Sequence, residues 1–251
     1  MPLAVAADTD IGRLRSVNQD AVHAATFRDG GAALLIVADG LGGHAAGEVA
    51  SRSAVETIAE AVAADLAGNG RLDTDPAAFL RALVEDTNAS IYVQAAGNPN
   101  WAGMGTTLVA AWISHDQVTV AHVGDSRAYC LHDGTLVQLT TDHSWVEAEV
   151  RAGRLRAEAA RSHPRRHIVL RSLGTGPALD VDVLGPVPFS SGDRLLLCTD
   201  GLHGVIPDDE SAAILGGYAP TECVVRLLAA ANDAGGPDNI GVAVGQSLPP
   251  A

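Results

Sequence analysis

The sequence predicts an α+β fold in which antiparallel β-sheets are covered on the outside by helices. Two observations lead to this prediction. Short apolar runs cluster in the middle of the chain and are separated by turns of a few residues, as expected for antiparallel strands. The helical stretches do not alternate regularly with strands, as they would in a doubly wound parallel sheet. No segment rich in Pro, Gly or Ser divides the chain, so we expect a single domain over residues 1–251.

The first part of the chain predicts one strand followed by two helices. The run AALLIVA at 32–38 lies between Gly-Gly and Asp-Gly, which is typical of a buried strand. Val49, Ile58, Val62 and Leu66 recur near helical spacing, and the Gly-Asn-Gly at 68–70 ends that helix. A second helix begins near 75–76, where a proline in the first turn costs no hydrogen bond, and ends near 97–99.

Strands predominate in the rest of the chain. A His-Asp-Gly-Thr turn at 132–135 indicates a hairpin. The region 144–161 is polar and helical in pattern, with a break near Gly153. A further helix is expected over 221–232, after a proline. The remaining strands are expected at 106–112, 117–123, 127–131, 194–199 and 240–244.

Composition excludes several classes of protein. The chain is 47% hydrophobic and 18% charged, which indicates a substantial core and argues against disorder. Its net charge of −14 repels nucleic acids and anionic membranes unless a basic patch is present. The densest basic stretch, 151–166, is interrupted by a glutamate. It is interpreted as a solvated surface, with an acidic or phosphorylated partner as the alternative.

The cysteines and the chain ends indicate a cytoplasmic protein. The three cysteines are scattered, without a Cys-x-x-Cys pair, and are expected to be reduced structural thiols. No signal peptide is visible, and no apolar run approaches the roughly 20 residues that span a bilayer. We therefore expect a soluble monomer without a membrane segment.

Aspartates at the ends of apolar runs are the candidate chemical groups. Three runs end in Asp beside Gly or Ser: LLIVADG at 34–40, VAHVGDS at 120–126 and LLLCTDG at 195–201. Asp-Gly alone is an ordinary turn signal, but here the aspartates Asp39, Asp125 and Asp200 follow the most apolar strands. Asp238 precedes the last strand within a Gly-Pro loop. If these strand ends meet, the clustered carboxylates repel one another, and bound cations relieve that repulsion.

Such a cluster favours metal-dependent phosphoryl chemistry. Oxygen ligands favour Mg²⁺, Mn²⁺ or Ca²⁺ over Zn²⁺, and Gly40 allows its carbonyl to approach a metal closely. Two adjacent ions can activate a bridging water and hold a phosphoryl group for in-line attack. Arg15 could grip the phosphate through its guanidinium, and His44 could protonate the leaving oxygen. Taken singly, these two residues are more often an exposed arginine and an ordinary loop histidine.

Nine short motifs, in order, carry a resemblance to a known family. They are GRLRSVNQD (12–20), VADGLGGH (37–44), GE (47–48), MGTT (104–107), HVGDSR (122–127), LTTDH (139–143), RSLG (171–174), CTDGL (198–202) and GPDNI (236–240). In these motifs the chain resembles the PPM, or PP2C-type, metal-dependent protein serine/threonine phosphatases, and the compact bacterial branch most closely. The resemblance covers nearly the whole chain.

The resemblance implies a fold, a metal complement and partners. The fold would be two antiparallel sheets packed face to face, with helix pairs outside. Two to three Mn²⁺ or Mg²⁺ ions would bind per chain. The substrates would be phosphoserine and phosphothreonine proteins, and a serine/threonine kinase would be a partner in signalling. The region at about 144–168 matches the family's mobile flap, which is expected to help select substrates. Within it, His167 stands where relatives more usually have Asn.

The resemblance also implies a role for each site residue. Asp39 would bridge two metals, and the Gly40 carbonyl would bind the second. Asp200 and Asp238 would complete the first metal site, and Asp125 with Asp200 would hold a third ion. Asp20 would act through metal-bound water. Arg15 would bind the substrate phosphate and His44 would be the general acid.

Two departures and three alternatives accompany this hypothesis. Gln19 stands where many relatives have Glu, and Leu41 where many have Met, but neither departure removes a direct ligand. The first alternative is a phosphatase dedicated to one phosphoprotein that controls transcription; Arg15 favours the general enzyme. The second is a catalytically silent metal-binding regulator, against which the complete aspartate set argues. The third is another two-metal hydrolase such as a nuclease, against which the acidic charge argues.

Overall fold

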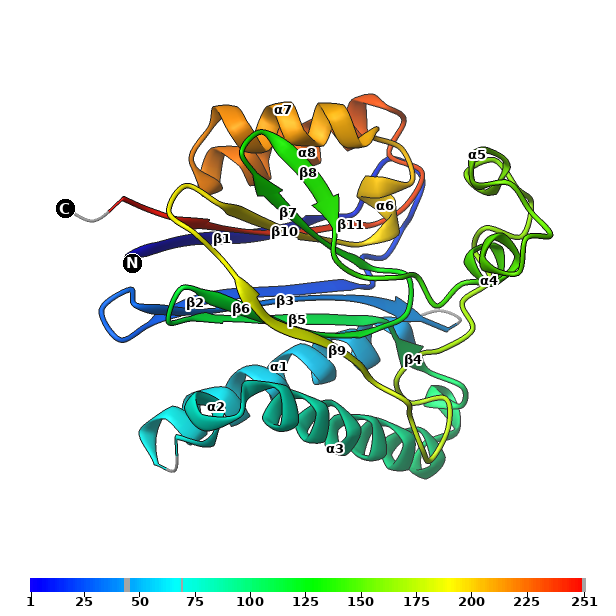
Figure 1. Cartoon of the computed structure of the whole chain (residues 1–251). Helices are drawn as coiled ribbons and strands as arrows, with labels where there is room; N and C mark the ends of the chain where they lie inside the picture. Colours follow the sequence, from blue (N-terminus) through cyan, green and yellow to red (C-terminus); the bar gives the residue numbers. More distant parts are fainter. Residues whose placement is uncertain (43–45, 69, 250–251) are drawn as a thin grey trace.

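Two antiparallel sheets packed face to face form the centre of the molecule, and helices cover both outer faces (Figure 1). The computed structural model describes residues 1–42, 46–68 and 70–249. This arrangement confirms the predicted α+β class and the face-to-face sandwich that the family resemblance implied.

The first sheet has the order β1-β11-β10-β7-β8. Its strands are β1 (Leu3–Asp10), β11 (Ile240–Ser247), β10 (Arg194–Cys198), β7 (Arg127–His132) and β8 (Thr135–Gln138). The helices α7 (Asp208–Gly217) and α8 (Pro220–Asp233) lie on its outer face (Figure 1). The short helix α6 (Asp200–His203) follows β10 directly.

The second sheet has the order β2-β3-β5-β6-β9, with a small strand pairing beside β3. Its strands are β2 (Asp20–Phe27), β3 (Ala32–Leu41), β5 (Leu108–Ser114), β6 (Gln117–Val123) and β9 (Asp182–Pro188), and the small strand is β4 (Gly105–Thr106). Helices α1 (Ala46–Ala67), α2 (Arg71–Thr74) and α3 (Pro76–Gly97) cover its outer face, and the 3₁₀ turn η1 (Pro99–Trp101) follows α3 (Figure 1).

Strand β3 shows why the central runs are apolar throughout. Its alternate residues Leu35 and Val37 belong to the core between the two sheets, whereas Leu34 and Ile36 belong to the core beneath the helices. All four side chains are fully buried. Because successive strand residues point to opposite faces, a strand covered on both faces needs apolar residues at every position.

The predicted helices form with the expected end signals. Asp75 caps α3: its side chain accepts a hydrogen bond from the Ala78 N–H at 3.0 Å, and Pro76 occupies the first position. Helix α8 likewise begins with a proline, Pro220. The polar region after residue 144 forms two short helices, α4 (Trp145–Arg151) and α5 (Ala157–Ala160), with the predicted break between them.

Several elements differ from the sequence prediction. The strand expected at 106–112 is divided into β4 and β5 at Thr107, where the Asp39 N–H donates to the Thr107 side chain. Strand β3 extends to Leu41, so Asp39 lies inside the strand and does not follow it. Strands β1, β2 and β9 and helices α2, α6 and α7 were not predicted from the sequence.

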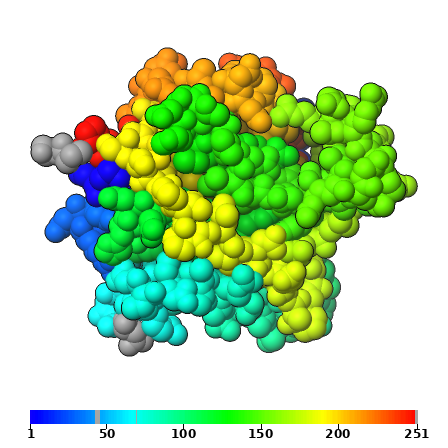
Figure 2. All heavy atoms as spheres, in the orientation of Figure 1, coloured from blue at the N-terminus to red at the C-terminus, as the bar shows by residue number. Residues whose placement is uncertain are grey.

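The topology brings the chemically interesting strand ends together. Strands β3 and β6 are both antiparallel to β5, so they point the same way and end at the same edge of their sheet. The segment with α4 and α5 projects beside that edge, on the right of Figures 1 and 2. Within the described part of the chain, none of the helices combines the length and apolar character needed to cross a membrane.

Candidate metal centre

The backbone of Asp39 is fixed by two threonines. The Asp39 N–H donates to Thr107 Oγ1 at 2.9 Å. Its carbonyl accepts from the Thr107 N–H and from Thr106 Oγ1, each at 2.9 Å. Thr107 Oγ1 also lies 2.7 Å from Ser126 Oγ, next to Asp125. A single buried hydroxyl pair therefore connects the Asp39 strand to the Asp125 turn.

Gly40 requires the absence of a side chain. A Cβ atom there would lie 2.2 Å from the Gly47 carbonyl oxygen and 2.7 Å from that of Gln19. No other residue fits without moving backbone. The Gly40 N–H donates to the Gln19 carbonyl at 3.1 Å, which fixes the plane of the peptide. The close neighbours of Gly40 are protein backbone, and the approach of its own carbonyl to a metal stays a prediction.

Asp20 lies opposite Asp39 across the β2–β3 pair and is almost fully buried. One carboxyl oxygen, Oδ2, accepts from Thr199 Oγ1 at 2.7 Å. The other, Oδ1, has no hydrogen-bond partner among the described residues. Burial raises the pKa of Asp20 to about 8, against the hydrogen bond from Thr199, which lowers it. An unpaired buried carboxyl oxygen at this position fits a role as acceptor for an ordered water.

The carboxyl groups at the strand ends influence one another. Burial and the charges of Asp20 and Asp200 hold the pKa of Asp39 well above its ordinary value. Burial and Asp200 raise the pKa of Asp125 to about 7. Such crowding means that one site holds several carboxyls that cannot all ionise without a compensating cation.

Asp200 is the anionic member of this group. It begins α6, and its Oδ2 lies 3.8 Å from His167 Nδ1. Burial acts to raise the pKa of Asp200, but His167, His203 and Arg166 outweigh it and bring the pKa below its ordinary value. Its Oδ1 is buried and has no partner within the described ranges. This oxygen is a free donor for a cation.

Arg15 contacts Asp238 directly. Its Nη2 lies 2.7 Å from Asp238 Oδ2, and half of the Arg15 side chain is exposed. Neighbouring Asn239 ties the Arg15 loop to the Asp238 turn, because its amide Nδ2 donates to the carbonyls of Ile11 and Val17 at 2.9 and 3.0 Å. The hydrogen bond to Asp238 raises the pKa of Arg15. The guanidinium thus carries its positive charge at the rim of the carboxylate cluster.

One cavity unites most of the predicted residues. It has a volume of about 310 Å³ and is lined by Arg15, Asp39, Gly40, Asp125, Asp200 and Asp238, among others. Asp20 is absent from that lining. The predicted general acid, His44, lies outside the described residues. The structure therefore brings together Arg15, four aspartates and Gly40, from segments far apart in the sequence.

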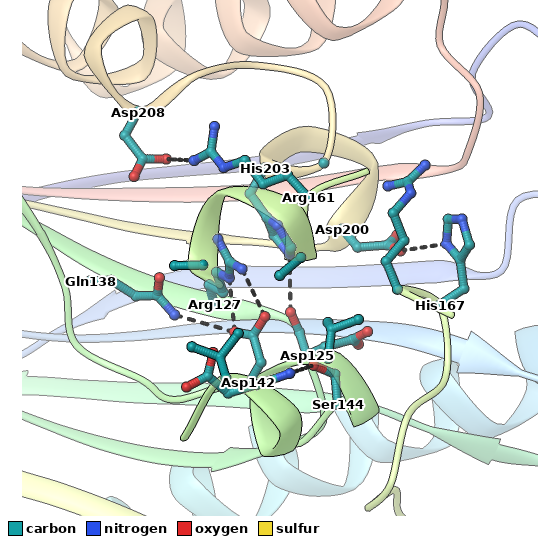
Figure 3. Close-up of a pocket in the computed structure, with 17 residues that line it drawn as sticks. Asp125, Arg127, Gln138, Asp142, Ser144, Arg161, His167, Asp200, His203 and Asp208 are labelled. Atoms are coloured by element: carbon teal, nitrogen blue, oxygen red, sulfur yellow. Dashed lines mark hydrogen bonds and ion pairs between the residues drawn. The ribbon is translucent and has the colours of Figure 1, made fainter. Parts of the chain in front are cut away.

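A second cavity of about 240 Å³ adjoins the first beneath the α4–α5 segment (Figure 3). Asp125 and Asp200 line both cavities, as does His167. Figure 3 shows His203 directed at the backbone of Asp125; its Nε2 lies 3.0 Å from the Asp125 carbonyl oxygen. From the sequence, His167 stood out as a departure from the family pattern but not as a neighbour of Asp200, and His203 was missed. His203 could have been noticed because it lies three residues after Asp200, about one turn along a helix.

The donor set is suited to hard cations that retain water. Within the part of the chain that the structure describes, no three His, Cys, Asp or Glu side chains are close enough to enclose an ion by themselves. A cation at this site would complete its shell with backbone oxygens and water molecules, as Mg²⁺ commonly does. Carboxylate and carbonyl oxygens predominate among the possible ligands, which disfavours Zn²⁺, although His167 adds a ring nitrogen to the lining.

Comparisons with known proteins agree with this geometry. A sequence model of the protein phosphatase 2C family matches residues 13–222. The chain is 40% identical over 237 residues to a serine/threonine phosphatase, stp, of Listeria monocytogenes, covering 93% of this chain and 92% of the relative. It is 39% identical over 242 residues to the serine/threonine protein phosphatase PstP of Mycobacterium tuberculosis, covering 96% of this chain and 44% of that longer protein.

Solved structures extend the comparison to the fold. The crystal structure of the Mycobacterium tuberculosis phosphatase PstP/Ppp superposes with a TM-score of 0.88 at 37% identity, covering 99% of this chain and 100% of that one. The PstP catalytic domain in complex with two manganese ions gives a TM-score of 0.81 at 35% identity, covering 98% and 99% of the two chains. With its fold, its aspartate cluster and its sequence in agreement, the chain belongs to the protein phosphatase 2C family of phosphatases.

Proposed function

We propose that this protein is a divalent-metal-dependent phosphatase that hydrolyses phosphoserine and phosphothreonine in proteins. The observation that carries the proposal is the cavity in which Asp39, Asp125, Asp200 and Asp238 converge beside Arg15. Similarity to named serine/threonine phosphatases over most of the chain supports the substrate class.

Asp39, Asp200 and Asp238 are the residues that would hold two ions, with the Gly40 carbonyl as a further ligand. Asp125, together with Asp200, would hold a third ion, and Asp20 would orient a water molecule beside Asp39. Mn²⁺ is the first candidate, because the related PstP structure contains two manganese ions, and Mg²⁺ is the alternative. Bound cations would activate a water molecule for attack on phosphorus and offset the charge of the phosphate.

Arg15 would bind the phosphate of the substrate. Its guanidinium is already placed at the cavity by the hydrogen bonds that tie its loop to Asn239. It currently bonds to Asp238, so an arriving phosphate and a cation on Asp238 would together replace that ion pair. A planar guanidinium can then donate two parallel hydrogen bonds to phosphate oxygens. His44 would protonate the leaving oxygen of the serine or threonine.

The segment at about 144–168 would act as a flap over the site and contribute to the choice of substrate. It carries His167, which lies near Asp200 at the edge of the cavity. Residues 1–251 would form one monomeric phosphatase domain that reverses phosphorylation by a serine/threonine kinase. Replacement of residues 144–168 by the flap of a relative should change the preference among phosphopeptides. An unchanged preference would restrict the flap to a structural role.

The decisive experiment measures hydrolysis of a phosphothreonine peptide with Mn²⁺, with EDTA, and after Asp39→Asn. Activity should require Mn²⁺ and fall by at least about 10²-fold in the variant, because the charge that would bridge two ions is lost. Asp86→Asn, which makes the same change at an exposed position on α3, is the matched control. Failure of folded, Mn²⁺-loaded wild-type protein to hydrolyse the peptide would refute the proposal and favour a silent metal-binding regulator.

A further inference from the structure

His143 lies outside the proposed ligand set, yet it holds both backbone polar groups of Gly124, the residue before Asp125. The His143 N–H donates to the Gly124 carbonyl at 2.7 Å. The ring of the same residue receives the Gly124 N–H on Nδ1 at 3.0 Å. One residue therefore fixes the peptide groups on both sides of the Gly124 Cα, immediately before the proposed ligand.

The ring of His143 is itself held in one orientation. Because Nδ1 accepts a hydrogen bond, the proton of the neutral ring must lie on Nε2. Nε2 is 3.2 Å from Asp182 Oδ2 and 3.1 Å from Arg171 Nη1, and that same Nη1 donates to the other oxygen of the Asp182 carboxylate at 2.7 Å. The ring of His122 packs against it with centroids 4.6 Å apart. Only 9% of the His143 side chain is exposed, so the ring has little room to turn.

The turn that His143 holds has few other conformations available. Gly124 has a φ of +107°, and a Cβ atom there would lie 2.6 Å from the Thr107 side chain. On the far side, the Asp125 carbonyl lies 3.0 Å from His203 Nε2. With the backbone fixed before and after Asp125, the turn limits the directions that its carboxylate can take.

The same histidine also forms the base of the flap. The Leu170 N–H donates to the His143 carbonyl at 2.7 Å, and the Trp145 N–H donates to the Ile168 carbonyl at 2.8 Å. A β-bridge joins Ser144 to Val169, between these two hydrogen bonds. The two stems of the flap thus meet at His143, which bonds to the Asp125 turn on one side and to the flap on the other.

We propose that His143 is a positioning residue: through Gly124 it holds the Asp125 carboxylate in its cation-binding orientation and couples that orientation to the base of the flap. This inference rests on the proposed function, in which Asp125 contributes to one cation site. Residues that orient metal ligands commonly matter as much as 10–100-fold for metal affinity.

Mn²⁺ titration of EDTA-stripped, dialysed protein by isothermal calorimetry tests the proposal. His143→Leu introduces an apolar side chain of similar size and removes the acceptor for the Gly124 N–H. It should weaken the Mn²⁺ site that Asp125→Asn also removes, by roughly 10–100-fold, and leave the other sites unchanged. His143→Asn should restore most of that affinity, because its amide oxygen can accept the same N–H.

The matched control is His132→Leu. His132 ends β7, the strand that begins just after Asp125, and its Nδ1 lies 2.7 Å from Asp193. The His132→Leu variant should bind Mn²⁺ with the affinity of the wild type. Asp182→Ala, at a half-exposed site, leaves the His143 ring in place, removes the acceptor for its Nε2–H, and should weaken the same Mn²⁺ site. It carries the test alone if His143→Leu does not fold.

Thermal unfolding in EDTA separates positioning from stability, since a purely structural residue would lower the melting temperature without changing the Mn²⁺ affinity of the folded protein. Wild-type Mn²⁺ affinity in folded His143→Leu or in Asp182→Ala would overturn the inference, as would equal losses in His143→Leu and His143→Asn. Hydrolysis of the phosphopeptide by the Mn²⁺-loaded wild type is measured alongside. Its absence refutes the proposed function, whereas its presence with unaltered binding in the variants refutes the role of His143 alone.

Discussion

Removal of one carboxylate from the metal centre should make the metal-free protein more stable. Asp125 is 6% exposed, and burial together with Asp200 raises its pKa from 3.8 to about 7. The folded protein therefore binds this proton more tightly than the unfolded chain. The charged carboxylate destabilises the folded protein. Asp125→Asn removes this charge and nearly preserves the shape of the side chain.

The magnitude follows from the size of the pKa shift. A rise of about three units corresponds to about 4 kcal/mol between the two protonation states. We expect about 1–3 kcal/mol in practice, because water can enter a metal-free site and the neighbouring carboxyls share their protons. For a chain of this length such a gain raises the melting temperature by roughly 3–10 °C.

The sign of the pH dependence is fixed by the direction of the shift. With a folded-state pKa above the unfolded value, the wild type loses stability as pH rises from about 4 to about 7, and the loss is complete above that range. The advantage of Asp125→Asn should therefore be largest at pH 8 and shrink steadily toward pH 4. In Mn²⁺ the order should reverse, since the wild type gains more from binding the cation.

Thermal unfolding at pH 8 and pH 5, in EDTA and in Mn²⁺, measures all four conditions. Asp86→Asn provides the control for loss of a negative charge at an exposed position. If metal-free Asp125→Asn at pH 8 is no more stable than the wild type, the reasoning from carboxylate crowding is refuted.

Two further predictions concern single side chains. Arg15→Ala should reduce kcat/KM for a phosphopeptide by about 10²-fold, measured by steady-state kinetics. It should change the free energy of unfolding by at most about 1 kcal/mol, because the Arg15–Asp238 pair is substantially exposed. A large loss of stability in denaturant unfolding would contradict this second expectation. Burial lowers the pKa of His122 to about 4, so the unfolded chain takes up a proton below pH 6.5 while the folded protein does not. Stability should fall as pH drops from 6.5 to about 4, and His122→Leu should make that slope shallower by about one proton, measured by denaturant unfolding across this range.

Local pattern was enough to predict the centre of the molecule. The run at 32–38 became β3 because a strand covered on both faces must be apolar at every position, which leaves a strong sequence signal. The helix beginning at Pro76 was equally clear, since its cap and its proline are local features. Signals that reside in consecutive residues survive in a single sequence.

The edges of the sheets gave weaker signals. Strand β1 lies at an edge and most of its residues are only half-buried; its apolar run, at 3–7, consists largely of alanine, which has a low strand propensity. Strand β9 contains two prolines, Pro186 and Pro188, which argue against a central strand but are tolerated at an edge. These strands become identifiable only when their neighbours are known.

The metal centre likewise combines features that have a local sequence signal with features that depend on tertiary contacts. Asp39, Asp125 and Asp200 could be proposed because each ends an apolar run in the sequence, and the fold brings the three together at one cavity. The pairing of Arg15 with Asp238 spans 223 residues and has no local signature. The contact between His143 and Gly124 is likewise a tertiary one. A sequence motif can therefore indicate which side chains would bind a cation, whereas the hydrogen bonds that set the angle of those side chains come from parts of the chain that only the fold brings together.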